Sequence, residues 1–268
     1  MLDALDGDDV DNSPRHYLGY SQIGEKCVRF LQYYHRRAYT AKISRRIRRL
    51  FDFGHIMEQV FYADFDRIGI SVQRVQEEIV GYMGHWKGHI DGTGIGVPGA
   101  EKTVHLLECK THNDASFQRL IKAGDVAISH PGHLHQATSY MGHLNLTRTL
   151  YLAYNKDDSS YWPQRISFDK DLFEELEFKS RFVVNNEHLA QRLGPGKETW
   201  HECRFCDAKS ICYGKEQINR NCRTCVHVEV HPKGTWKCGH PSLKVAMTRN
   251  WKEQIEACNK YELDEGLS

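Results

Sequence analysis

The stretch from Leu106 to Thr111, which reads Leu-Leu-Glu-Cys-Lys-Thr, decides the fold that we expect for this chain. Its apolar character predicts a buried strand, yet it carries two charged residues. Because side chains alternate across a strand, Glu108 and Lys110 point to one face and Cys109 to the other. Burying a carboxylate and an ammonium is costly unless a local function needs them. A bound divalent cation and a nucleophilic water would need both.

The expected partner strand lies upstream, in the stretch Trp-Lys-Gly-His-Ile-Asp-Gly from Trp86 to Gly92. A Pro98-Gly99 pair between the two stretches is typical of a turn. A hairpin without a bulge, centred directly after Gly99, places Asp91 opposite Glu108. Directly opposed side chains are close enough to share one metal ion. Three nearby glycines could hide a bulge, so this register is a hypothesis that a structure with the two carboxylates on opposite faces would refute.

Length and composition narrow the possible classes of protein. The 268 residues can bury a sizeable core, as one domain with an appendage or as two small domains. Lys plus Arg (36) nearly equals Asp plus Glu (35), so any surface that attracts nucleic acid must be local. No long apolar run or signal peptide is present, so we expect a cytoplasmic protein without membrane contact. Residues 1–13, with five aspartates, are expected to form a disordered acidic tail.

Periodicity and turn residues predict an alternation of helices and strands. Pro131 is a good first-turn residue and marks one helix start. Gly194-Pro195-Gly196 marks a boundary. The expected helices cover most of 14–53, then 44–68, 114–128, a segment from 131, 169–193 and about 241–260, and the expected strands are three within 72–111, then 149–155 and 161–168.

Glu58 lies on the apolar stripe of the predicted 44–68 helix, four residues after Gly54. It is either a site carboxylate or a residue at the edge of the stripe that reaches solvent. Magnesium suits a site of a few carboxylates whose other positions hold water and phosphate oxygens. The carbonyl oxygen of Cys109 is a further candidate ligand. Lys110 would orient the attacking water and stabilise charge on phosphorus, whereas a general base would need a depressed pKa.

Four motifs occur in an order that resembles the PD-(D/E)XK nucleases, and in particular their RecB-like branch. The motifs are Gly54-His55-Ile56-Met57-Glu58, Gly88-His89-Ile90-Asp91-Gly92, Leu107-Glu108-Cys109-Lys110-Thr111 and Gln136-Ala137-Thr138-Ser139-Tyr140. The resemblance implies an α/β, restriction-endonuclease-like fold, in which helices flank a central mixed sheet. It covers roughly residues 18–215.

The same resemblance implies roles for the motif residues. Glu58, Asp91 and Glu108 would bind Mg²⁺ or Mn²⁺, and Lys110 would be catalytic. DNA or active-site contacts would come from Gln136 and Tyr140. His55 is a rival to Glu58, although the spacing favours Glu58.

A basic run without an acidic residue lies just before and within the predicted 44–68 helix. By itself such a run is typical of a solvated helix face. Beside a nuclease-like site it favours a groove that follows the phosphates of DNA. The run consists of Arg36, Arg37, Lys42, Arg45, Arg46, Arg48 and Arg49.

Seven of the nine cysteines fall into two groups with metal-ligand spacing. The first group is Cys203, Cys206 and Cys212, with Cys27 far upstream, and three clustered thiolates need a fourth ligand for zinc or for a cubane cluster. The RecB-like nucleases associated with CRISPR systems, and the AddB-type nuclease domains, hold a 4Fe–4S cluster with one early and three late cysteines. Cys27 matches the early position. The resemblance therefore implies a structural 4Fe–4S cluster, with zinc as the alternative.

The second group is Cys222, Cys225, Cys238 and His240, whose spacing is typical of a zinc ribbon or knuckle. His227 and His231 are alternative fourth ligands, and unligated thiols are the other possibility. This gives a predicted C-terminal cysteine-rich extension, 216–268, after a nuclease domain over 14–215. Cys258 is expected to be unliganded.

We therefore expect a metal-dependent deoxyribonuclease. The resemblance favours an exonuclease on single-stranded DNA ends, 5′→3′, acting in recombination, repair or phage DNA processing. A recombination or CRISPR-adaptation protein is an expected partner, and the host cytoplasm is the expected location if a phage encodes the chain. The alternatives are a structure-selective endonuclease and a catalytically silent DNA-binding subunit.

Overall fold

The computed structural model describes residues 8–10, 15–40, 42–185, 188–242 and 254–267. The chain divides into two compact units. Unit 1 takes in Ile43–Ile79 and Gly88–Leu176, and unit 2 takes in Val10–Lys42, Val80–Lys87 and Glu177–Ser268. The division into residues 14–215 and 216–268 stays a prediction.

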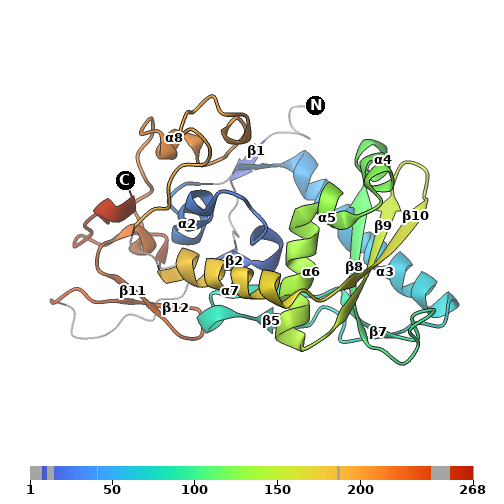
Figure 1. Cartoon of the computed structure of the whole chain (residues 1–268). Helices are drawn as coiled ribbons and strands as arrows, with labels where there is room; N and C mark the ends of the chain where they lie inside the picture. The colour runs from blue at the N-terminus through green and yellow to red at the C-terminus, as the bar shows by residue number, and fades with distance from the viewer. Residues whose placement is uncertain (1–7, 11–14, 41, 186–187, 243–253, 268) are drawn as a thin grey trace. The chain divides into compact units, whose positions relative to one another are not determined.

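A five-stranded sheet in the order β10-β9-β8-β7-β4 is the centre of unit 1 (Figure 1). The strands are β4 (Ser71–Gln73), β7 (Gly92–Ile95), β8 (His105–His112), β9 (Arg148–Asn155) and β10 (Tyr161–Ser167). The pair β8–β9 is parallel and the other pairs are antiparallel, so the sheet is mixed. The parallel pair needs a long crossover, which the helices α4 (Asp114–Ala123), α5 (Val126–Ser129) and α6 (Pro131–Leu144) supply. The predicted mixed α/β class is confirmed.

The predicted register is confirmed for the strand pair β7–β8, but the predicted partner strand is wrong, because Trp86–His89 forms β6 in a separate three-stranded sheet instead of pairing with β8. Gly92 pairs with Leu107, and Thr93 pairs with Leu106. The same register, continued by one residue, puts Asp91 opposite Glu108. The pairing has no bulge from Gly92 to Gly94, and beyond it residues 96–104 form the connecting loop.

Helix α3 (Arg45–Arg67) covers the face of this sheet to which Leu107 and Cys109 point. It begins at Ser44, whose hydroxyl accepts a hydrogen bond from the Ile47 N–H at 3.3 Å. Met57, Phe61 and Phe65 recur along one side of the helix and pack in the core with Leu107, Cys109 and their neighbours. Each fully buried side chain of this kind contributes about 1.5–3 kcal/mol to the free energy of folding. Since Cys109 lies in this core, Glu108 and Lys110 belong to the opposite face.

Unit 2 is built from short elements. Tyr20 and Trp86, both fully buried, stack with ring centroids 4.5 Å apart. Helix α2 (Val28–Arg36) ends at Arg37, which has a left-handed backbone with φ of 54°. The other elements in or entering this unit are β2 (Leu18–Gly19), η1 (Tyr20–Gln22), β5 (Glu78–Val80), η2 (Tyr82–Gly84), β6 (Trp86–His89), α7 (Lys170–Asn185), η3 (His201–Cys203), α8 (Lys209–Cys212), η4 (Cys222–Thr224), β11 (Val228–His231), β12 (Thr235–Cys238) and η5 (Glu265–Leu267).

The described residues form three smaller sheets besides the five-stranded one: β2-β6-β5 form a three-stranded sheet, β11 pairs with β12, and β1 (Asp8–Val10) pairs with β3 (Lys42–Ser44). Among the described helices, none has the length and apolarity needed to cross a membrane.

The structure differs from the sequence prediction at several helix ends. Most of 14–53 was expected to be helical, but α2 occupies only nine residues of it before α3. Residues 114–128 form two helices instead of one because Gly124 takes a left-handed conformation and ends α4. Five strands, not three, fall within 71–112, and α7 ends at Asn185. Most of the predicted helix at 241–260 lies outside the described residues.

Candidate active site

Asp91 lies directly before β7 and is held from two sides. Its Oδ2 accepts a hydrogen bond from the Cys109 N–H of β8 at 2.7 Å. Its carbonyl oxygen accepts one from the Tyr62 hydroxyl of α3, also at 2.7 Å. The helix on one face of the sheet thus fixes the backbone of Asp91, while the neighbouring strand fixes its carboxylate.

Glu108 is the most deeply buried carboxylate of this group, with 1% of its surface exposed. Its Oε2 is buried without a hydrogen-bond partner among the described residues. The ammonium of Lys110 forms an ion pair with Oε1. Buried oxygens that lack donors are costly in an apolar strand. A divalent cation can bind such oxygens and remove this cost, so Glu108 and Asp91 fit a Mg²⁺ or Mn²⁺ site.

Burial and mutual charge set the ionisation of these groups. Burial raises the pKa of Glu108 to about 7, with Asp91 adding to the rise and Lys110 opposing it. Burial also raises the pKa of Asp91. For Lys110, burial favours the neutral amine, but the two carboxylates outweigh it and raise the pKa of the ammonium. A stable ammonium suits water orientation and charge stabilisation better than general-base chemistry.

Glu58 does not contact this trio directly in the described structure. Its Oε1 lies 3.2 Å from Nδ1 of His55, and its Oε2 accepts a hydrogen bond from Nε2 of Gln76 at 2.9 Å. His55 is thus paired with Glu58, its rival for the metal, through Nδ1. The choice between Glu58 and His55 as the helix ligand therefore stays open.

Helix α6 carries the last motif. Tyr140 is buried, and its hydroxyl donates a hydrogen bond to the carbonyl oxygen of His89 at 3.0 Å, two residues before Asp91. Gln136 is 8% exposed on the same helix. Tyr140 thus acts on the site by holding the strand that leads to Asp91.

A buried chain of hydrogen-bonded side chains, which no sequence motif indicated, lies on the Glu108 side of β8. Tyr151, which pairs with Glu108 across the sheet, contacts both Nε2 of His112 (3.1 Å) and Nδ1 of His133 (2.8 Å) through its hydroxyl. Burial lowers the pKa of His112 to about 4 and that of His133 to about 2, with Lys110 adding to both shifts. Both imidazoles are therefore neutral. The alternation of side chains along β8 and β9 could have shown that His112 and Tyr151 share the face of Glu108.

The first cysteine group shares one cavity. Cys27, Cys203, Cys206 and Cys212 all line a cavity of about 20 Å³ in unit 2. Four thiols on one cavity match the donor set of an iron–sulfur cluster or a zinc ion. Within the described part of the chain, however, no three His, Cys, Asp or Glu side chains are already arranged as a metal site.

The second cysteine group lines another cavity of unit 2, of about 30 Å³. Cys222, Cys225, Cys238 and His240 are there together, with His227 beside them. His231, an alternative ligand in the sequence analysis, does not line this cavity. Its Nε2 lies 3.3 Å from the Glu229 carboxylate instead. Cys258, expected to be unliganded, lines this cavity too.

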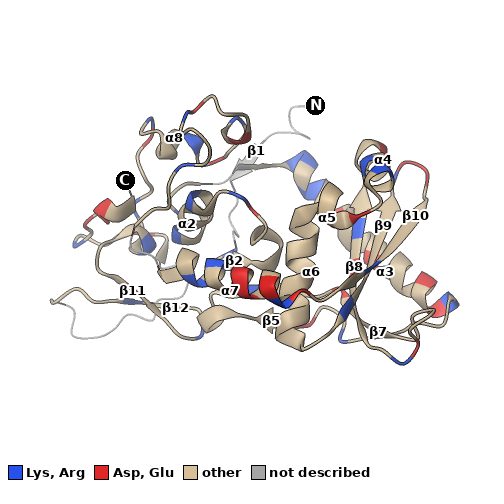
Figure 2. Ribbon diagram, in the orientation of Figure 1, with Lys and Arg blue, Asp and Glu red and all other residues tan. Residues whose placement is uncertain are grey.

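The basic run is split between different environments. Arg45, Arg46 and Arg49 are exposed at the start of α3, where the ribbon in Figure 2 is coloured blue for basic residues, and Arg48 is half-buried. Arg36 is 6% exposed, donates a hydrogen bond to the Arg223 carbonyl oxygen at 2.9 Å and lies 3.7 Å from Asp264. Arg36 is thus engaged inside unit 2. Arg37 is half-buried, and Lys42 opens β3.

No protein-family model and no curated protein matches the chain. An alkaline exonuclease (LHK-Exo) from Laribacter hongkongensis is 18% identical, with a TM-score of 0.48, over 64% of this chain and 88% of that one. LHK-Exo in complex with dAMP is 16% identical, with a TM-score of 0.48, over 63% and 86%. SSO0001 is 13% identical, with a TM-score of 0.44, over 76% and 88%. At TM-scores below 0.5 these similarities do not assign a function to this chain.

Proposed function

We propose that this protein is a Mg²⁺- or Mn²⁺-dependent nuclease that hydrolyses phosphodiester bonds of DNA. The observation that carries the proposal is the group Asp91, Glu108 and Lys110: Asp91 accepts a hydrogen bond from the N–H of Cys109, the residue between Glu108 and Lys110 on β8, and Lys110 is paired with Glu108. Asp91 and Glu108 would hold the metal, with the Cys109 carbonyl oxygen and either Glu58 or His55 as further ligands. The metal would polarise the phosphoryl oxygen and lower the pKa of the attacking water.

The protein's own groups have distinct tasks in this reaction. The ammonium of Lys110 lies against Glu108, where it can orient a water and stabilise the negative charge that develops on phosphorus. Tyr62 and Tyr140 hold the backbone around Asp91. The exposed Arg45, Arg46 and Arg49 would contact DNA phosphates.

We further propose that the enzyme is an exonuclease that acts on single-stranded ends, 5′→3′, in DNA recombination, repair or phage DNA processing. Cys27, Cys203, Cys206 and Cys212 would hold a 4Fe–4S cluster with a structural role, and Cys222, Cys225 and Cys238 would hold zinc together with a fourth ligand from the same cavity. The shared cavities support both assignments. A brown sample with absorbance near 400 nm after anaerobic purification would distinguish the cluster from zinc.

The direct test is cleavage of labelled single-stranded DNA with Mg²⁺ or Mn²⁺ and with EDTA. Lys110→Ala and Asp91→Ala should each lower the rate by at least about 100-fold, since each removes a group that acts in the transition state. Lys122→Ala, at an exposed position of α4, is the matched control and should cut at the wild-type rate. Undiminished cutting by both site variants would exclude this nuclease assignment.

The end dependence needs its own substrates. An exonuclease should leave circular single-stranded DNA intact, and a block on the 5′ end should protect a linear strand when a 3′ block does not. Cleavage of circular DNA would identify an endonuclease, and cleavage that only a 3′ block prevents would reverse the proposed polarity.

A further inference from the structure

A cavity in unit 2 gathers more metal-binding side chains than the sequence spacing predicted. It measures about 30 Å³, close to the space of a single water molecule. Four cysteines and two histidines line it, and they come from three segments of the chain: Cys222, Cys225, His227, Cys238, His240 and Cys258. Soft thiolates of this number and a cavity of this size suit a single zinc ion.

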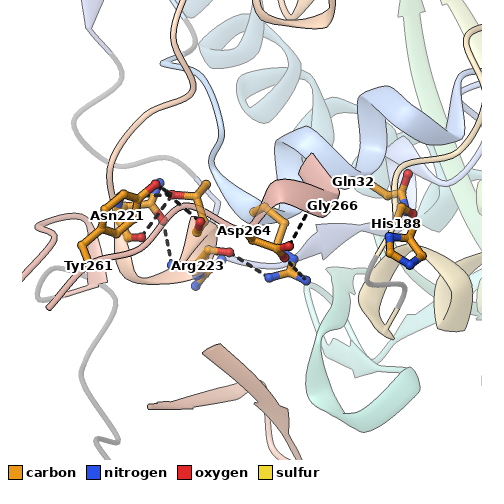
Figure 3. A network of polar contacts seen from close by, with 9 residues as sticks. Gln32, His188, Asn221, Arg223, Tyr261, Asp264 and Gly266 are labelled. Carbon is orange, nitrogen blue, oxygen red and sulfur yellow. Dashed lines mark hydrogen bonds and ion pairs between the residues drawn. The ribbon is translucent and has the colours of Figure 1, made fainter. Parts of the chain in front are cut away.

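The first two thiols lie on a rigid turn. In η4 the Asn221 Oδ1 accepts a hydrogen bond from the Arg223 N–H at 2.8 Å, and Thr224 Oγ1 accepts one from the Asn221 N–H at 3.2 Å. Figure 3 shows this turn beside Tyr261, whose hydroxyl lies 3.2 Å from Thr224 Oγ1. Cys222 and Cys225 are therefore positioned before any metal binds, which is what a tight site requires.

The chain after residue 254 brings Cys258 to this turn. The segment forms antiparallel contacts with it: Val226 N–H bonds to the Glu262 carbonyl oxygen at 2.9 Å, and Asp264 N–H bonds to the Thr224 carbonyl oxygen at 3.0 Å. Cys222 Sγ lies 3.7 Å from the carbonyl oxygen of Glu256, two residues before Cys258. On the other side, Cys238 pairs with Val228 at the end of the β11–β12 hairpin.

Of the other candidates for the fourth position, His240 is unsuited by its hydrogen bonds. Its Nδ1 accepts a hydrogen bond from the Ser242 N–H at 3.1 Å. The proton of the neutral ring therefore resides on Nε2, which leaves no lone pair for a metal. A ligating histidine normally donates from its second nitrogen. The Nε2 of His227 lies 3.6 Å from Glu262 and is buried without a hydrogen-bond partner among the described residues, so His227 is the competing candidate for the fourth position.

Charge favours a fourth thiolate. The guanidinium of Arg223 is 1% exposed, lies over the Trp236 ring at 4.9 Å, and forms no ion pair with a carboxylate among the described residues. Lys237 and Lys260 also line the cavity. A zinc ion with four thiolates has a net charge of −2, and it would balance these cations better than a site with three thiolates and a neutral imidazole.

We propose that Cys222, Cys225, Cys238 and Cys258 bind one structural zinc ion, with Cys258 in the place that spacing assigned to His240. This site ties the end of the chain to the Cys222–Cys225 turn and to the β11–β12 hairpin. It does not depend on the proposed nuclease activity.

The test is metal analysis of the full-length chain and its variants by inductively coupled plasma mass spectrometry. The wild type should hold one zinc per chain at this site. Cys258→Ser should lose that zinc as completely as Cys222→Ser does, with iron content unchanged. His240→Ala, the matched control, should keep it. A wild-type chain without zinc would overturn the proposal, as would a Cys258→Ser chain that keeps its zinc.

A second variant guards against misfolding of Cys258→Ser. Cys258→His offers a replacement ligand and should keep one metal per chain. In the cobalt-substituted protein it should lose about a quarter of the thiolate-to-cobalt absorbance, because one of four Co–S bonds is replaced. An unchanged cobalt spectrum would show that Cys258 is not a ligand, and His227→Ala would then be expected to lose the metal instead.

Discussion

At the scale of single residues, Glu108 is the most deeply buried carboxylate of the proposed site, and its Oε2 has no hydrogen-bond partner among the described residues. Such a carboxylate destabilises the metal-free chain and stabilises the metal-bound one. Mn²⁺ should therefore raise the unfolding temperature of the wild type, and it should do so much less for Glu108→Gln, which keeps the shape and removes the charge. Thermal melts with and without Mn²⁺ measure this. An equal shift in both chains would place the ion elsewhere.

Tyr62 is a residue that no sequence motif singled out, although it lies one turn after Glu58 on α3. Tyr62→Phe removes the hydrogen bond to the Asp91 carbonyl oxygen and should cost about 1 kcal/mol of stability. It should also slow cleavage about 10-fold, because small misplacements of catalytic groups are costly. Tyr161→Phe is the matched control: it removes a 2.7 Å bond from a phenol to Asp64. Cleavage assays at saturating metal should show the loss in rate for Tyr62→Phe alone, and an equal loss in both variants would remove Tyr62 from the site.

At the scale of elements, α6 presents two glycines in very different surroundings. A Cβ at Gly142 would lie 2.3 Å from the Phe173 ring of α7, whereas one at Gly132 meets nothing within 4 Å. Gly142→Ala should therefore destabilise by about 1–3 kcal/mol through overpacking. Gly132→Ala, in the same helix, should be neutral or stabilise by up to about 1 kcal/mol. Urea titrations report both, and equal midpoints for the two variants would contradict the packing of α6 on Phe173.

The elements also show what the sequence could predict. Helix α3, the β7–β8 register and the start of α6 at Pro131 depend on local signals, namely an apolar stripe, a Pro-Gly turn and a proline in a first turn. The break at Gly124 is set by one left-handed residue and was missed. The positions of Glu58, Gln76 and Cys258 relative to the sites depend on tertiary packing, which no local pattern encodes.

At the scale of the whole molecule, both units bury neutral histidines, so acid should unfold the chain early. Burial lowers the pKa of His85 in unit 2 to about 4, with Arg223 and Lys87 adding to the shift, and lowers that of His112 in unit 1 to about 4. An unfolded histidine titrates near pH 6.5. Because the folded pKa is lower, this stability is fully present above about pH 6.5 and is lost as the pH falls to about 4, by up to about 3 kcal/mol for each histidine.

His85→Gln tests this linkage in one unit. The His85 Nε2 donates to the His231 carbonyl oxygen at 2.8 Å, and a glutamine amide can keep that donor without titrating. The variant should lose some stability at pH 7.5 through imperfect packing, yet its unfolding free energy should fall less steeply between pH 6.5 and 4.5 than that of the wild type. Urea titrations at a series of pH values measure the slope. Parallel pH profiles for the two chains would mean that folding leaves the pKa of His85 unchanged, which would contradict its complete burial beside Arg223.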